Sequence, residues 1–83
     1  APILRFPDFN REFLIQTDAS AKVLCAVLTQ VYDNIEHPIA FASRTLSKSE
    51  KAFSNTEREL LAAVFATKQF APYIYGREAI IQT

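Results

Sequence analysis

The chain has 83 residues, which suffices for one small domain or for part of a larger one. Its hydrophobic content of 49% and charged content of 22% are those of a globular protein and exclude a disordered one. Nine Lys and Arg residues balance nine Asp and Glu residues, so the net charge gives no support for nucleic-acid binding.

The single cysteine, Cys25, excludes an internal disulfide and favours an intracellular, reducing setting. With one Cys and one His, His37, a zinc site of the usual kind is excluded. No apolar run approaches the roughly 18 residues of a membrane span, and no signal peptide is recognisable. The chain does not begin with methionine, which indicates a mature product or an excised piece of a longer polypeptide.

The first half of the chain predicts strands. Residues 1–10 contain three turn-forming or extended-chain residue types and predict a connector from an upstream domain. Residues 13–17 predict a first strand, and the β-branched, continuously apolar residues 23–32 predict a central strand covered on both faces. A turn at residues 33–34 leads to a short third strand, residues 39–43. Pro38, immediately before these residues, would suit the first position of an edge strand.

The second half predicts a helix and a last strand. Capping-box spacings at Ser47–Glu50 and Ser54–Glu57 predict a short helical turn and a main helix over residues 55–70. Leu60, Leu61, Val64, Phe65 and Lys68 follow helical spacing, and the small Ala62, Ala63 and Ala66 allow a close approach to a sheet.

Pro72 should end that helix, residues 73–76 form a turn, and residues 79–83 form a fourth strand. A strand–helix–strand crossover after an antiparallel meander places the fourth strand parallel to the first. The predicted class is therefore α+β, with a mixed sheet and the helix on one face.

Two of the carboxylates are candidates for chemistry. Asp18 ends the first strand, where an acid is costly unless a cation pairs with it. Glu59 follows the start of the helix, whereas Glu50 and Glu57 are explained as caps. If the helix crosses the first strand, Asp18 and Glu59 meet at one end of the sheet, where Mg²⁺ would suit them. Spacing alone equally allows a turn-capping Asp18 and a surface Glu59.

Five short stretches, taken together, carry a family resemblance. They are Thr17-Asp18-Ala19-Ser20, Ala26-Val27-Leu28-Thr29-Gln30, the run from His37 to Leu46, Glu57-Arg58-Glu59-Leu60-Leu61-Ala62, and Tyr73-Ile74-Tyr75-Gly76. In order and spacing the chain resembles the ribonuclease H domain of gypsy-type LTR-retrotransposon reverse transcriptases, over nearly its whole length.

The resemblance implies a ribonuclease H fold with a five-stranded mixed sheet and hydrolysis of the RNA strand of an RNA–DNA hybrid. The implied reaction uses two Mg²⁺ ions roughly 4 Å apart, with Mn²⁺ as an alternative. The family's first catalytic Asp falls on Asp18 and its catalytic Glu on Glu59, as metal ligands. The implied partners are the hybrid and an upstream polymerase domain, in the cytoplasm (a virus-like particle) or the nucleus and without a membrane.

Departures from the family pattern limit what these 83 residues are expected to do. The family's third carboxylate would follow Thr83 directly, and a later carboxylate and the fifth strand are also missing, so residues 11–83 match the N-terminal part of the domain. We therefore expect the chain alone to be inactive or nearly so, and to associate through an exposed fourth strand. Cys25 replaces a glycine that is usual in the family.

Three residues are candidates for substrate contact. Asn55 lies where related enzymes place polar residues against RNA 2′-hydroxyls, while simple capping explains its neighbour Ser54. Arg44 could bind a phosphate or be an ordinary solvated residue, and Ser20 belongs to the motif that contains Asp18. The alternative to an enzyme is a retroelement-derived binding or scaffolding module whose metal site is lost. An unrelated small α+β interaction domain does not account for the motif register.

Overall fold

The computed structural model describes residues 4–77 and 79–82. Four strands are present in this part of the chain: β1 (Phe13–Ala19), β2 (Val23–Tyr32), β3 (Ile35–Thr45) and β4 (Ala79–Gln82). The helical segments are the short 3-10 helix η1 (Glu50–Ala52), α1 (Asn55–Gln69) and α2 (Ala71–Ile74). The last residue of the expected fourth strand, Thr83, lies outside the described residues.

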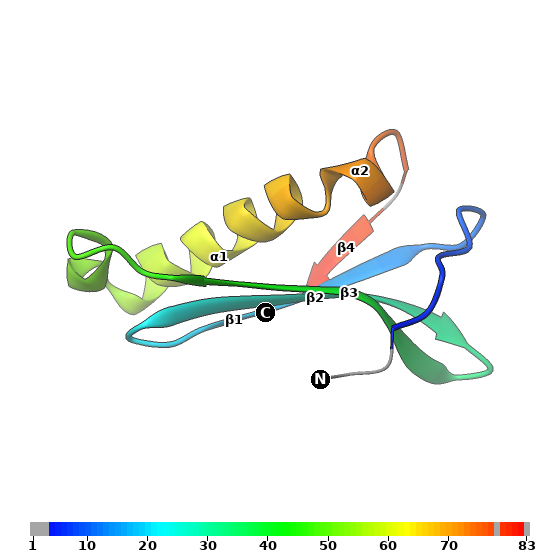
Figure 1. Ribbon diagram of the computed structural model, residues 1–83, viewed down its shortest axis with the longest axis horizontal. Helices are drawn as coiled ribbons and strands as arrows, with labels where there is room; N and C mark the ends of the chain where they lie inside the picture. Colours follow the sequence, from blue (N-terminus) through cyan, green and yellow to red (C-terminus); the bar gives the residue numbers. More distant parts are fainter. Residues whose placement is uncertain (1–3, 78, 83) are drawn as a thin grey trace.

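The strands form one mixed sheet in the order β3-β2-β1-β4. β1, β2 and β3 are antiparallel neighbours, and β4 pairs parallel to β1. α1 lies over one face of the sheet and carries the chain from β3 back to β4 (Figure 1). The predicted meander, crossover and parallel fourth strand are confirmed.

The hairpin between β2 and β3 extends further than expected. Asp33 and Asn34 have φ values of 53° and 65°, the left-handed conformations that a two-residue hairpin turn of type I′ requires. β3 therefore starts at Ile35, and the prediction that Pro38 begins the strand is wrong. Pro38 is tolerated inside β3 because that strand lies at the sheet edge, next to a register shift at Leu28/Thr29.

The face of α1 that contacts the sheet is centred on small residues. Ala62 and Ala66 are buried, and Phe70 follows them on the same face. Leu60 and Val64 remain 63% and 50% exposed, whereas Leu61 and Phe65 are partly buried against the core clusters. An alanine face lets the helix axis approach the strands closely.

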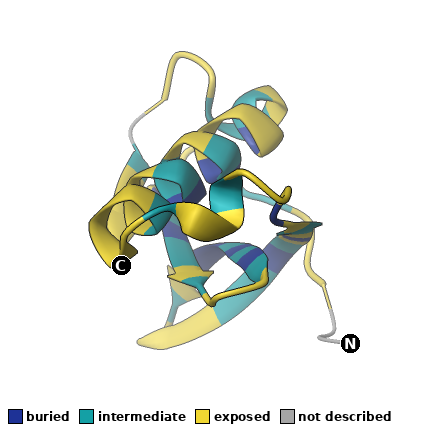
Figure 2. Cartoon of the chain, turned by 90° about the vertical axis from the view of Figure 1, so that its left-hand side faces the viewer, coloured by how far each residue is buried: buried dark blue, intermediate teal, exposed yellow. Residues whose placement is uncertain are grey.

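β2 is covered on one face only, contrary to the expectation from its apolar sequence. Its alternate residues Leu24, Ala26 and Leu28 are fully buried under α1, whereas Cys25 and Val27 are half-buried. In the described chain the helices lie on one side of the strands, so the opposite face of the sheet stays open (Figure 2).

Local signals set the ends of α1. Ser54 and Glu57 form the predicted capping box, in which each side chain bonds the other residue's backbone amide. α1 ends at Gln69, and Pro72 lies in the first turn of α2 instead of terminating α1. Within the described chain, no helix has the length and apolarity needed to cross a bilayer.

Candidate active site

Asp18 is the penultimate residue of β1, opposite Cys25 of β2. Its side chain is exposed. The expectation that burial makes this acid costly is therefore wrong for the described chain, because a solvated carboxylate needs no cationic partner. What the structure retains of the prediction is the position, at the far end of a strand whose first residues form the core.

Glu59 is the fifth residue of α1 and is exposed as well. One turn later Ala62 packs into an apolar cluster with Leu24 and Leu46, and Ala19 contacts the same cluster. Since Ala19 directly follows Asp18, the two acids flank one shared cluster. The end of β1 and the N-terminal turns of α1 thus lie at the same end of the sheet.

The course of α1 explains this placement. Its later residues Ala66 and Phe70 pack with Phe13 and Ile15, near the start of β1, whereas Ala62 packs near the strand's end. α1 therefore runs antiparallel to β1, as a crossover that delivers a parallel strand must. The N-terminal turns of the helix consequently lie over the end of β1 that carries the acid.

The two carboxylates start from opposite sides of the sheet. Strand side chains alternate, and Ile15 and Ala19 face α1, so Asp18 faces away from the helix. The described part of β4 pairs with β1 only as far as Gln16, opposite Gln82. Beyond that pair the edge of β1 has no described neighbour on this side.

This donor set is suited to a hard divalent cation. Both groups are carboxylates, the ligands that Mg²⁺ prefers, and solvent access leaves room for the waters it retains. Among the described residues, neither Asp18 nor Glu59 shares a hydrogen bond or ion pair with another side chain. In the same residues no group of three or more His, Cys, Asp or Glu side chains converges, so Asp18 and Glu59 would by themselves be too few to hold a metal ion.

The remaining helix-start acids are used as caps. The Arg44 guanidinium, with the Ser47 amide, lowers the pKa of the Glu50 carboxyl to about 2. The Ser54 backbone amide lowers the pKa of Glu57 below its usual value. Both carboxylates thus already accept hydrogen bonds from backbone amides. This agrees with the prediction that Glu57 is a capping residue, unlike Glu59.

The structure places the three predicted substrate contacts in local hydrogen bonds. Arg44 makes a two-point ion pair with Glu50, at 2.8 and 2.9 Å. The Asn55 Oδ1 accepts a hydrogen bond from Arg58, and the Ser20 Oγ accepts bonds from the amides that follow it in the β1–β2 turn. Only exchange of these partners would free them for a nucleic acid.

Gln30 has a structural role that was not expected from the sequence. It is fully buried, and its side chain bonds the entry segment at Asp8 and Arg11. The signal in the sequence was a polar residue within the mainly apolar run of residues 23–32. In the structure the alternation of buried and half-buried residues fails at this point, and three consecutive residues, 28–30, are buried.

Comparison with known proteins supplies the class. A family model described as "RNase H-like domain found in reverse transcriptase" matches residues 1–81. Two solved structures of a foamy viral protease-reverse transcriptase, both in complex with double-stranded DNA, superpose with TM-scores of 0.83 and 0.80 over 94% of this chain and 16% and 14% of theirs. At 20% identity these show a shared fold, which the description of the family model names as RNase H-like.

The chain belongs to the family of RNase H-like domains found in reverse transcriptases. Its sequence is 46% identical over 81 residues to the Pol polyprotein of Drosophila melanogaster transposon 412 and 50% identical over 80 residues to that of transposon 297. It is 42% identical over 78 residues to that of transposon gypsy. These matches include 98%, 96% and 94% of this chain, which spans only 6–7% of the length of those polyproteins.

Proposed function

We propose that this domain hydrolyses the RNA strand of RNA–DNA hybrids as part of a retroelement reverse transcriptase. The observation that carries the proposal is the placement of Asp18 and Glu59 on the two flanks of one apolar cluster. Both carboxylates are exposed, and beyond Gln16 the edge of β1 has no described neighbour on the β4 side. Membership of the reverse transcriptase family supplies the substrate class.

Asp18 and Glu59 would hold divalent metal ions, Mg²⁺ or Mn²⁺, through their carboxylate oxygens. Bound there, the metals would supply the charge that activates a water and stabilises the leaving oxygen of the phosphodiester. The chain's own contribution is positional. Packing of Ala62 against the cluster fixes the helix over the strand, and so fixes the two carboxylates relative to each other.

The rest of the ligand set would come from the continuation of β4. The parallel register pairs Gln16 with Gln82, so a strand extended in that register brings its second following residue level with Asp18. The resemblance to gypsy-type enzymes places a third carboxylate at that residue, directly after Thr83. We therefore propose that residues 11–83 contribute half of the site, and that they are inactive by themselves.

The test uses the reverse transcriptase that contains this domain, with RNA cleavage in a hybrid and DNA synthesis measured side by side. Asp18→Asn and Glu59→Gln should each lower cleavage by more than about 100-fold, since even outer-shell partners of metal ligands contribute 10–100-fold. DNA synthesis should be unchanged.

Two neighbouring acids provide matched controls. Glu57→Gln keeps a residue that serves in a capping box, and Asp33→Asn keeps a residue that tolerates the turn conformation, so both should cleave nearly as the parent does. If Asp18→Asn and Glu59→Gln cleave as well as these controls, the catalytic assignment is wrong. The domain would then be a non-catalytic binding or scaffolding module.

A further inference from the structure

We infer that Gln30 is a positioning residue, which clamps residues 4–12 onto the sheet and fixes where the preceding polypeptide enters the domain. Residues 4–12 form the entry strap. The consequence for cleavage rests on the proposed function: a fixed entry point sets the distance along the hybrid between the upstream polymerase part and the RNA cut.

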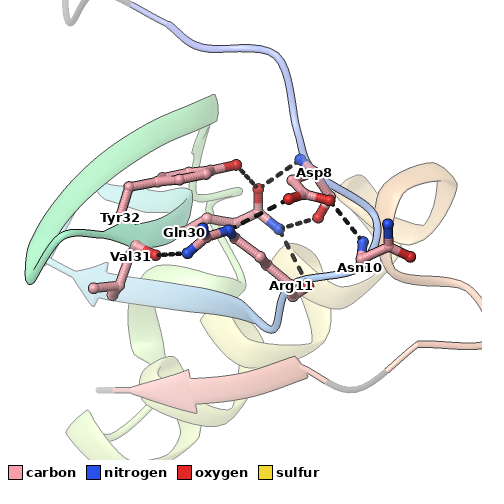
Figure 3. A network of polar contacts seen from close by, with 6 residues as sticks. All are labelled: Asp8, Asn10, Arg11, Gln30, Val31 and Tyr32. Carbon is pink, nitrogen blue, oxygen red and sulfur yellow. Dashed lines mark hydrogen bonds and ion pairs between the residues drawn. The ribbon is translucent and has the colours of Figure 1, made fainter.

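The centre of the clamp is a fully satisfied buried amide (Figure 3). The Gln30 Nε2 donates to the backbone carbonyls of Asp8 and Arg11, at 2.8 and 3.2 Å. Its Oε1 accepts from the Asp8 amide at 2.9 Å and from the Tyr32 hydroxyl at 3.0 Å. Gln30 therefore bonds both backbone groups of Asp8, as a neighbouring strand would, and a buried amide is stable only with such partners.

Cationic side chains of the strap stack on the same part of the hairpin. The guanidinium carbons of Arg5 and Arg11 lie 3.7 and 4.3 Å from the centroid of the Tyr32 ring. Arg11 also donates to the Val31 carbonyl at 3.1 Å, and the Arg5 amide donates to the Pro38 carbonyl at 2.9 Å. The strap is thus bonded to β2 and β3 at several points along its length.

An aromatic contact joins the strap to β1. The rings of Phe9 and Phe13 lie 6.1 Å apart, and the Arg77 guanidinium lies 4.5 Å from the Phe9 ring. Phe13 begins the strand that carries Asp18, five residues or about 17 Å further on. A strap held at one end of β1 therefore keeps a constant offset from the acid at the other end.

The composition of the contact indicates positioning more than core formation. No strap residue belongs to either buried cluster of the described chain, and Leu4, Phe6 and Phe9 are 54%, 94% and 47% exposed. What holds the strap is directional: hydrogen bonds to backbone groups and stacking on one ring. Such bonds specify a path for the chain, whereas apolar burial alone would tolerate several.

The experiment compares Gln30→Glu with Gln69→Glu, which places the same change on the exposed surface of α1. Glu at position 30 keeps the acceptor oxygen and loses the donor to both strap carbonyls. Exchange of the Asp8 amide with solvent, followed by NMR in the 83-residue chain, should accelerate at least about 10-fold in Gln30→Glu and stay unchanged in Gln69→Glu.

A second variant covers the case in which Gln30→Glu loses protection throughout the β1–β2 ladder. Arg11→Ala removes the bond to Val31, the pair with Asp8 and the stacking on Tyr32, all outside the core. It should also accelerate exchange at Asp8 while ladder amides remain protected. Unchanged Asp8 exchange in both variants would show that the strap is not clamped, whatever the domain catalyses.

The functional arm uses the complete reverse transcriptase and maps RNA cuts relative to the primer 3′ end. Gln30→Glu should spread the cuts over several additional positions, while total cleavage stays within about twofold of Gln69→Glu. A loosened strap with an unchanged cut pattern would overturn the positioning role. Absence of cleavage in the parent enzyme would instead overturn the proposed function, and amide exchange would still decide whether Gln30 clamps the strap.

Discussion

Ala62 is the residue on which the geometry of the candidate site depends most directly, so Ala62→Leu is a stringent test. Ala62 is 1% exposed and packs against Leu24 and Leu46, beside the strand end that carries Asp18. A leucine there has no space unless α1 moves away from the sheet. Such a movement would separate Glu59 from Asp18 as well as destabilise the fold.

The expected magnitude follows from the change in volume. Leu adds three carbon atoms at a filled position, and overpacking of that size typically costs about 1–3 kcal/mol. Helix propensity contributes little, because Ala and Leu are both strong helix formers. A chain of 83 residues has a total stability of roughly 4–12 kcal/mol. The substitution should therefore remove a substantial fraction of the free energy of unfolding.

Urea unfolding followed by far-UV circular dichroism measures the effect. With a denaturant dependence of roughly 1–2 kcal/mol per M for a domain of this size, the midpoint should fall by about 0.5–3 M. Ala63→Leu is the matched control, because Ala63 is half-buried beside a shallow hollow formed with Val64 and Thr67. Its stability should change by less than about 0.5 kcal/mol.

Equal midpoints for Ala62→Leu and Ala63→Leu would refute the reasoning, since they would mean that the sheet does not select small residues on α1. In the complete enzyme Ala62→Leu should also reduce RNA cleavage more than Ala63→Leu. Reduced stability with undiminished cleavage would show that the position of Glu59 is not set by this contact.

Three further changes test the local interactions. Because the folded pKa of Glu50 is about 2, below its usual 4.5, the stabilisation from its pair with Arg44 is complete above pH 4.5 and is lost as the pH falls toward 2; Glu50→Gln should therefore flatten the fall in melting temperature over that range. Ser54→Ala should cost about 1 kcal/mol, seen as a drop of roughly 4–8 °C in melting temperature, and Ser54→Asp should restore most of it. Gly76→Ala should cost about 1–2 kcal/mol through backbone strain alone, since φ is +72° and an added Cβ meets no atom within 4 Å; Gly76→Asn should cost less, and equal losses for the two would contradict this account.

The sequence predicts the strand order and the helix start because each depends on local signals. The turn at residues 33–34, the capping boxes and the crossover rule act over a few residues or follow from chain direction, so the mixed sheet is recovered in full. The sheet-facing side of α1 is recovered in part: the sequence predicts that Ala62, Ala63 and Ala66 approach the sheet, and Ala62 and Ala66 are buried, whereas Ala63 is half-buried. Leu60 and Val64 satisfy the same periodicity as Ala62 and Ala66, and only the close approach of the sheet favours the smaller pair.

Long-range contacts account for the other differences. Pro38 could be placed inside β3 only with knowledge of the register shift opposite it, which depends on β2. The sequence predicts only that Gln30 lies in a strand. It does not predict the clamp, because the hydrogen-bond partners of Gln30 lie some twenty residues away on the entry strap. In both cases a polar or imino residue interrupts an apolar run, and the interruption is explained by a partner that sequence spacing does not reveal.

Asp18 illustrates how a correct position can follow from an incorrect physical premise. The strand–acid pattern suggested a buried carboxylate in need of a cation, yet the side chain is exposed. Asp18 is therefore a candidate metal ligand because of its neighbours, and not because it is buried. Ala19, the next residue, packs against the cluster that contains Ala62, and Ala62 lies one turn after Glu59, at the same end of the sheet. An exposed Asp18 contributes to stability only when it binds a metal ion. Without metal, the free energy of unfolding of Asp18→Asn should therefore equal that of the parent. With Mg²⁺ and the completed ligand set, Asp18→Asn should be less stable than the parent, because the parent alone gains from metal binding.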